Sequence, residues 1–85
     1  MKEGFIYSQT TGECVSYTRK VTNEQYSIFD FKTNNSIGYI VMNNGLAHVY
    51  DNSNNYIEYG VYRSNPDMIL FYNQSTSECV KYMKL

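Results

Sequence analysis

Apolar and polar side chains alternate with a period of two along most of this 85-residue chain, in short stretches separated by Asn, Ser, Thr and Gly. This alternation, together with many Tyr, Val and Ile residues, predicts half-buried β-strands rather than helices. Ala occurs once and Leu three times, so good helix formers are scarce. We expect eight strands, at residues 4–9, 13–18, 25–32, 37–43, 46–51, 56–63, 68–73 and 78–83.

Every predicted connection is short, so strands that are neighbours in sequence should pair antiparallel as a meander. An open meander of eight strands would leave two unpaired edges, which favour aggregation. We therefore predict an all-β fold, in which an eight-stranded antiparallel meander closes into a small barrel or folds into a two-layer sheet. A chain of this length is expected to form one domain over residues 1–85.

The two ends of the chain carry nearly the same sequence. Residues 5–17 and residues 70–82 share the order Tyr, Gln, Thr, Glu-Cys-Val, Tyr, and two looser copies lie between them. An internal repeat indicates a structural unit that is used more than once. We predict four β-hairpins, at about residues 5–20, 29–43, 48–63 and 70–84. Small polar pairs are expected in the turns: Thr11-Gly12, Asn34-Asn35, Asn44-Gly45, Asn54-Asn55 and Thr76-Ser77.

The turn sequence of the first hairpin suggests a register. With Gly12 in the left-handed conformation of a three-residue turn, Tyr7 should face Val15 and Phe5 should face Tyr17. These four side chains would then share one face, with Cys14 opposite Ser8 on the other face. The same construction in the last hairpin places four further side chains on one face: Leu70, Tyr72, Val80 and Tyr82.

The central stretch of the chain follows a recognisable order: Gly38-Tyr39, Asn44-Gly45, Val49-Tyr50, an Asn-rich turn over 52–55, and Gly60-Val61. Over residues 38–62 it resembles one unit of the short aromatic hairpin repeats of choline-binding proteins and clostridial toxin tails. The resemblance implies a hairpin repeat and a carbohydrate- or cell-wall-binding role. Choline sites of that family resemble aromatic cages dominated by Trp, which this chain lacks, so no ligand residue is carried over.

Charge and hydropathy exclude several classes of partner. The net charge is −1, and the seven Lys and Arg residues are scattered, so the chain lacks the basic stripe of a nucleic-acid-binding protein. No run of 18 apolar residues and no signal-like N-terminus is present, so we expect a cytoplasmic protein that does not bind membranes. No cofactor motif is found, and we expect no cofactor.

The two cysteines, Cys14 and Cys79, hold equivalent positions in the first and last hairpins. They fit either small thiols packed on strands or a disulfide that joins the two hairpins. A cytoplasmic location and the absence of CxxC spacing favour reduced thiols. A catalytic thiolate would need a nearby base, and the single histidine, His48, is expected to be an ordinary strand residue, so we predict neither a catalytic nor a metal-binding site.

Glu13 and Glu78 form the other repeated polar pair. Paired carboxylates can catalyse glycoside hydrolysis, but such chemistry needs a cleft for which a small barrel has little room. A cross-strand hydrogen bond to the facing glutamine, Gln9 or Gln74, is the favoured interpretation. The chain is therefore expected not to be an enzyme.

The ten tyrosines are the most promising functional residues, since each offers a flat apolar ring with a polar tip. Core or cross-strand packing should use at least half of them. The candidate binding residues lie on three neighbouring strands: Tyr39, Tyr50, Tyr56, Tyr59 and Tyr62. Our first hypothesis is a protein–protein interaction or assembly module, self-associating or binding another protein, of the kind that phages and mobile elements use to cap a particle or block a host factor. The alternative is a carbohydrate- or cell-wall-binding, lectin-like repeat module, with one shallow site per repeat.

Overall fold

The computed structural model describes every residue from Met1 to Leu85. All of its regular elements are strands, so no helix is available to cross a membrane. The strands are β1 (Phe5–Ser8), β2 (Cys14–Lys20), β3 (Gln25–Asp30), β4 (Ser36–Asn43), β5 (Leu46–Asp51), β6 (Tyr56–Arg63), β7 (Met68–Asn73) and β8 (Cys79–Lys84). The all-β prediction is confirmed: β5, β6 and β7 have the predicted bounds, and the other strands differ by one or two residues at one or both ends.

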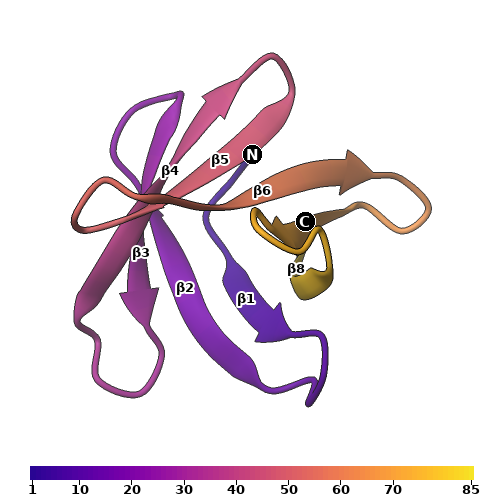
Figure 1. Cartoon of the computed structure of the whole chain (residues 1–85), viewed down its shortest axis with the longest axis horizontal. Helices are drawn as coiled ribbons and strands as arrows, with labels where there is room; N and C mark the ends of the chain where they lie inside the picture. Colours follow the sequence, from indigo (N-terminus) through magenta and orange to yellow (C-terminus); the bar gives the residue numbers. More distant parts are fainter.

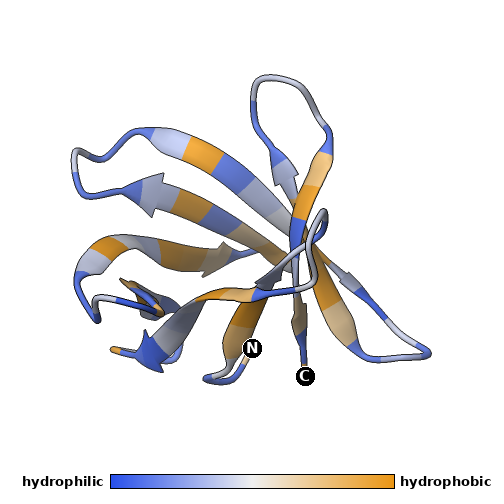
Figure 2. Cartoon of the chain, turned by 90° about the horizontal axis from the view of Figure 1, so that it is seen from below, coloured by the Kyte–Doolittle hydropathy of each residue, from blue (hydrophilic) through white to orange (hydrophobic).

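Each strand pairs antiparallel with the next, and β8 returns to pair with β1, so the meander closes into a barrel. In Figure 1 strands β2 to β6 converge at the left of the view, and in both Figure 1 and Figure 2 the two chain ends lie close together. Both ends are also anchored by hydrogen bonds. The Tyr26 hydroxyl donates to the Met1 carbonyl, and the Leu85 amide donates to the Asp67 carbonyl. Because closure pairs both edges, the sheet offers no unpaired strand.

The turns lie where their sequences predict. All five predicted turn pairs fall between strands. Asn44 and Gly45 have φ angles of 53° and 78°, the left-handed conformation that a two-residue hairpin turn requires. In the four longer turns one residue takes the same conformation: Gly12, Asn34, Asn54 or Ser77. Small polar residues are therefore needed at these positions by the backbone itself.

A polar side chain at the start of each longer turn holds the turn by accepting backbone hydrogen bonds. The Asp30 carboxylate accepts from the amides of Lys32 and Thr33 at 2.8 and 3.0 Å. Asp51, Asn73 and Ser8 do the same in the other three turns. These donors, the Thr33 amide for Asp30 and the Asn55 amide for Asp51, lower the pKa of both carboxyls.

The predicted register of the first hairpin is partly wrong, because a β-bulge lies between its strands. Phe5 pairs with Tyr17 as expected, but Tyr7 pairs with Cys14, and Val15 is the extra residue of the bulge. The last hairpin repeats the difference, since Tyr72 pairs with Cys79 rather than with Val80. Alternation along a strand does not reveal an inserted residue, which shifts the remaining side chains by one position.

The same bulge occurs in four hairpins, β1–β2, β3–β4, β5–β6 and β7–β8. Its extra residue is β-branched each time: Val15, Ile37, Ile57 and Val80. A repeated bulge increases the local twist of each hairpin, which helps eight short strands close into a narrow barrel. The four hairpins thus share one local packing arrangement. Corresponding residues in them can be compared as internal copies.

The interior is filled by inward-facing residues of all the strands. Figure 2 shows apolar and polar bands alternating along the ribbons, as expected when one face of a sheet is buried. Nine apolar residues form the core: Ile6, Tyr26, Ile28, Ile40, Ala47, Val49, Ile69, Phe71 and Met83. Glycine makes room for this core at Gly60, where a Cβ atom would lie 2.7 Å from the Ile69 side chain and 2.9 Å from the Phe71 ring. The barrel is therefore a packed core with little free interior.

Candidate functional site

Aromatic rings form four stacked pairs on the outside of the barrel, one at each junction between hairpins. The pairs are Tyr7–Tyr82, Tyr17–Phe29, Tyr39–Tyr50 and Tyr59–Tyr72, with ring centroids 5.1 to 5.5 Å apart and interplanar angles of 14° to 18°. Seven of the ten tyrosines are used in this way, and Tyr26 is the only tyrosine in the core. Cross-strand packing therefore accounts for most tyrosines, as the sequence suggested.

None of the five tyrosines proposed as binding residues is buried, and one of them, Tyr50, contacts two of the others. Tyr50 stacks on Tyr39 at 5.1 Å and packs against Tyr56 at 5.4 Å. Tyr59 belongs to a separate pair with Tyr72. Tyr62 lies near the far end of β6, where its hydroxyl donates a hydrogen bond of 2.7 Å to Asp67. The five residues thus form one small cluster and two separate rings rather than a single patch.

His48 contacts the small tyrosine cluster. Its Nδ1 atom lies 2.9 Å from the Tyr56 hydroxyl, and the two rings are 5.5 Å apart. Partial burial raises the pKa of Tyr56, with a smaller contribution from the neighbouring phenols of Tyr50 and Tyr59. The raised pKa keeps the Tyr56 phenol protonated at neutral pH.

A larger feature lies at the junction of β2 and β3, outside the predicted site. A surface groove with a volume of about 480 Å³ runs between the N-terminal segment, β2 and the β3–β4 turn. It is lined by eight residues: Glu3, Gly4, Phe5, Tyr17, Thr18, Arg19, Phe31 and Asn34. Its size falls within the range of roughly 300–1,000 Å³ that is typical of ligand sites.

Two phenylalanines project into solvent at this groove. Phe5 is 51% exposed and Phe31 is 47% exposed. Their rings meet edge to face, with centroids 6.2 Å apart and an interplanar angle of 80°. Tyr17 lies 6.5 Å from Phe5 and completes a group of three rings. Adjoining aromatic rings that stay half-exposed to water form an apolar patch, and this patch marks a candidate contact surface.

Polar groups surround these rings. The Arg19 guanidinium lies 5.7 Å from the centre of the Tyr17 ring, within reach of a cation–π interaction. The Tyr17 hydroxyl donates to the Asn34 side-chain oxygen at 2.9 Å, which fixes the ring against the β3–β4 turn. A Glu3 carboxylate oxygen accepts from the Lys20 amide at 2.8 Å. The groove therefore combines an apolar floor with a positioned cation and a positioned carboxylate.

The internal copies indicate which groove residues the fold does not require. Phe31 is the first turn residue after Asp30, and its counterparts after Ser8, Asp51 and Asn73 are all polar amides: Gln9, Asn52 and Gln74. Phe5 pairs with Tyr17, and the residues paired with the corresponding tyrosines are Ser27, His48 and Leu70. Since phenylalanine occurs at each position in only one copy, the barrel does not need it there.

Sequence analysis missed this groove for a definite reason. The pattern of apolar residues predicts a strand through residue 32 and so places Phe31 in it, whereas β3 ends at Asp30. An aromatic residue in a turn whose counterparts are Gln, Asn and Gln was the available signal. This difference can be recognised only when the sequences of the four turns are aligned.

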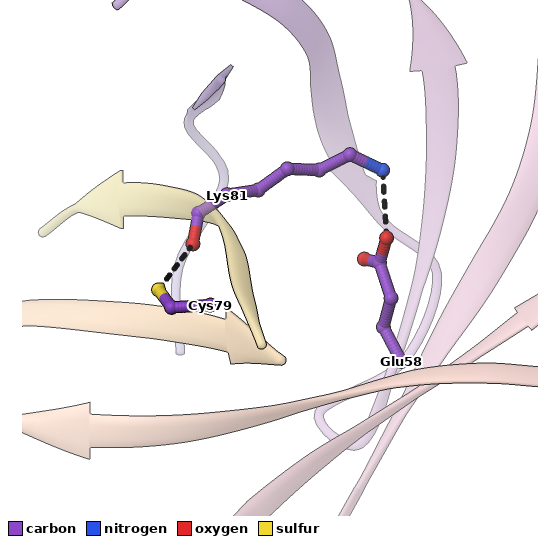
Figure 3. Close-up of polar contacts among 3 residues, drawn as sticks. All are labelled: Glu58, Cys79 and Lys81. Atoms are coloured by element: carbon purple, nitrogen blue, oxygen red, sulfur yellow. Dashed lines mark hydrogen bonds and ion pairs between the residues drawn. The ribbon is translucent and has the colours of Figure 1, made fainter. Parts of the chain in front are cut away.

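The barrel mouth holds the protein's only ion pair. Lys81 Nζ lies 2.9 Å from a Glu58 carboxylate oxygen, and Glu58 is 8% exposed (Figure 3). The corresponding inward residues of the first two hairpins are Ser16 and Gly38. The cavity beside the pair measures only about 40 Å³, so we assign it no ligand.

Both cysteines are free thiols, and neither lies in the core. Partial burial raises the pKa of each thiol, and each sulfur donates to the carbonyl two residues ahead, as Figure 3 shows for Cys79 and Lys81. No three His, Cys, Asp or Glu residues are grouped closely enough to hold a metal ion. Glu13 and Glu78 use their carbonyls to accept backbone hydrogen bonds from Ser8 and Asn73, and the predicted bonds to Gln9 and Gln74 are not formed.

Comparisons of the chain with protein-family models, with characterised proteins and with solved structures found no match. The choice of site therefore rests on geometry and on the comparison among the four hairpins.

Proposed function

We propose that this protein is a non-enzymatic module that binds another protein through the groove at the β2–β3 junction. The observation that carries the proposal is the pair Phe5 and Phe31, two half-exposed rings in contact at the opening of a groove of about 480 Å³. Exposed aromatic side chains beside an arginine are typical of the residues that dominate binding energy in protein interfaces. A small module of this kind suits a phage or mobile element, where it would cap a particle or block a host factor.

A different protein is a better candidate than a second copy of the chain. The expectation of self-association rested partly on unpaired sheet edges, and closure of the barrel pairs both edges. What remains is exposed aromatic surface: Phe5 and Phe31 meet at one groove, and Tyr56 and Tyr62 lie on β6. Light scattering on the purified protein tests this directly, with a monomer as the expected result.

The Phe31→Gln substitution tests the proposal, because Gln stands at the corresponding position in two of the other turns. Capture of proteins from the native source should be compared for the wild type, Phe31→Gln and a matched control, Val21→Gln. Val21 is an exposed apolar side chain in the β2–β3 turn, 58% exposed and outside the groove. A partner retained by the wild type and by Val21→Gln, but reduced about tenfold with Phe31→Gln, is the expected result. Equal capture by all three proteins contradicts the proposal.

A gain of binding provides a second test. His48, Val61 and Gln74 hold the positions around Tyr59 that Phe5, Arg19 and Phe31 hold around Tyr17. The triple substitution His48→Phe, Val61→Arg and Gln74→Phe, made in the Phe31→Gln protein, should restore part of the lost capture. Restoration by the triple variant would show that the aromatic group and the arginine are sufficient for binding.

A carbohydrate-binding role is the second candidate, and one repeated contact favours it. The Tyr17 hydroxyl donates to Asn34 at 2.9 Å, and the Tyr39 hydroxyl donates to Asn54 at 2.7 Å. An aromatic ring with an adjacent amide is suited to stacking on a sugar and bonding its hydroxyls. These rings already stack on Phe29 and Tyr50, however, which leaves less ring surface for a ligand. A glycan array probed with the wild type and with Phe31→Gln decides between the two candidates.

A further inference from the structure

We propose that the groove binds an extended peptide segment of its partner in which a large apolar side chain, preferably aromatic, lies within one or two residues of an Asp or Glu. This inference rests on the proposed function and specifies its ligand.

Backbone pairing cannot supply the affinity for such a segment. Peptides often bind by adding a strand to the open edge of a sheet. In this barrel every strand, including β1 and β8, is paired on both sides. Recognition must therefore use side chains, and the ligand has to present an apolar group and a polar group to the outer face of β2.

The apolar half of the groove suits one large side chain. Phe5 and Phe31 lie edge to face at 6.2 Å, so part of each ring surface stays open. Tyr17 lies beside Phe5 and is held by its hydrogen bond to Asn34. A ring that packs against these three residues gains aromatic contacts in addition to the burial of apolar area. The rings are already positioned, so little side-chain entropy is lost on binding.

The positive charge of Arg19 on the groove favours a carboxylate in the ligand. Arg19 has no carboxylate partner, because the only ion pair in the protein joins Lys81 to Glu58. Its guanidinium is positioned beside the Tyr17 ring and keeps its N–H donors for a ligand. Glu3, on the same groove, is already engaged by the Lys20 amide. Its negative charge disfavours a polyanion such as a nucleic acid, whereas a single carboxylate beside Arg19 is compatible with it.

Selection from a phage-displayed library of random 12-residue peptides tests this inference. The wild-type protein should enrich sequences in which Phe, Tyr, Trp or Leu lies within two residues of Asp or Glu. Arg19→Glu should shift the enriched charge from acidic to Lys or Arg while keeping the apolar residue. Phe31→Gln should abolish enrichment. Arg63→Gln, a charge change on an exposed arginine of β6 outside the groove, should select the same sequences as the wild type.

Affinities of a selected peptide, measured by fluorescence anisotropy, distinguish the carboxylate inference from the proposed function. Arg19→Gln should weaken binding about tenfold, the effect of one charge-assisted hydrogen bond at a partly exposed site, and should remove most of its salt dependence. Enrichment of apolar peptides without acidic residues, lost with Phe31→Gln, overturns the carboxylate inference and leaves the proposed function standing. Peptides that bind Phe31→Gln as well as the wild type overturn both. Circular dichroism of each variant checks that the barrel remains folded.

Discussion

The junction between β2 and β3 and the junction between β6 and β7 have the same architecture and different surfaces. The Tyr17–Phe29 pair stacks at 5.4 Å and 17°, and the Tyr59–Tyr72 pair stacks at 5.5 Å and 16°. Backbone contacts repeat as well. The amide of Phe31 donates to the Val15 carbonyl at 3.0 Å, as the amide of Gln74 does to the Ile57 carbonyl.

Above this shared framework the side chains diverge. One junction carries Phe5, Arg19 and Phe31, and the other carries His48, Val61 and Gln74. The stacked rings and the backbone hydrogen bond recur because the barrel needs them. The residues that do not recur are not required by the fold and are available for binding. Comparing corresponding residues in the repeated hairpins therefore separates the structural residues from the candidate binding residues.

The stacked pairs should matter for stability at both junctions. We expect Tyr17→Ala and Tyr59→Ala each to lower the free energy of unfolding by about 2–3 kcal/mol, because each removes a partly buried ring and its stacking contact. Urea denaturation of both variants measures this, and Tyr17→Ala should cost up to about 1 kcal/mol more because the Tyr17 hydroxyl also bonds Asn34. A large cost at one junction alone would mean that the architectures are not equivalent.

At the barrel mouth, the last two hairpins carry the Glu58–Lys81 ion pair, and the first two carry the uncharged Ser16 and Gly38 at the corresponding positions. Glu58→Ser should lower the free energy of unfolding by about 1–2 kcal/mol, since it leaves the Lys81 ammonium without its partner. The cost stays moderate because the Lys81 side chain is 34% exposed. The double variant Glu58→Ser with Lys81→Ser should cost less than the two single changes added together, as the serine already present at Ser16 suggests. Additive costs in urea denaturation would argue against a direct coupling.

Exchanging the turn residues should separate binding from folding. We expect Phe31→Gln and Gln74→Phe each to change the free energy of unfolding by no more than about 0.5 kcal/mol, since both side chains lie on the surface and the backbone hydrogen bond is kept. Thermal melts of the two variants test the expectation. A destabilisation well above this value for Phe31→Gln would assign the Phe31 ring to the fold rather than to a ligand.

The cysteines should have the smallest effect. The structure leaves both thiols free, so Cys14→Ser with Cys79→Ser should leave the melting temperature and peptide binding nearly unchanged. The raised pKa of each thiol lowers its thiolate fraction at neutral pH. Alkylation by iodoacetamide at pH 7.5 should therefore be slower than that of a small model thiol. An intact mass that rises by two hydrogens on reduction would instead reveal a disulfide.

Local sequence signals were sufficient to predict most of the fold. Asn44-Gly45 located the β4–β5 turn because two successive left-handed residues leave few alternatives, and β5 consequently begins where expected. The bulge at Val15 could not be predicted, because Cys14 and Val15 are both apolar and the alternation fits a register with or without an extra residue. Its presence reversed the expected faces of Cys14 and Val15.

The candidate site was harder to predict because it depends on contacts between distant segments. The groove joins Glu3 and Phe5 to Phe31 and Asn34, which come from different hairpins. The Glu58–Lys81 contact likewise follows from barrel closure and has no signature in local sequence. The abundance of tyrosine predicts a binding site on β4, β5 and β6. Most of those rings instead form the stacked pairs that hold neighbouring hairpins together.

Closure of the barrel also determines where it opens most easily. The β1–β8 seam is the only junction without a chain connection, and its register covers just Ile6 with Met83, Tyr7 with Tyr82 and Ser8 with Lys81. Fluctuations that separate this seam leave the four-residue β1 attached to β2 alone, so amide hydrogen exchange is expected to be fastest there. The groove lies on the other side of β1, against β2, and it survives this opening because Phe5 stays paired with Tyr17. Occupancy of the groove should therefore slow exchange between β1 and β2 and leave the exchange at the β1–β8 seam unchanged.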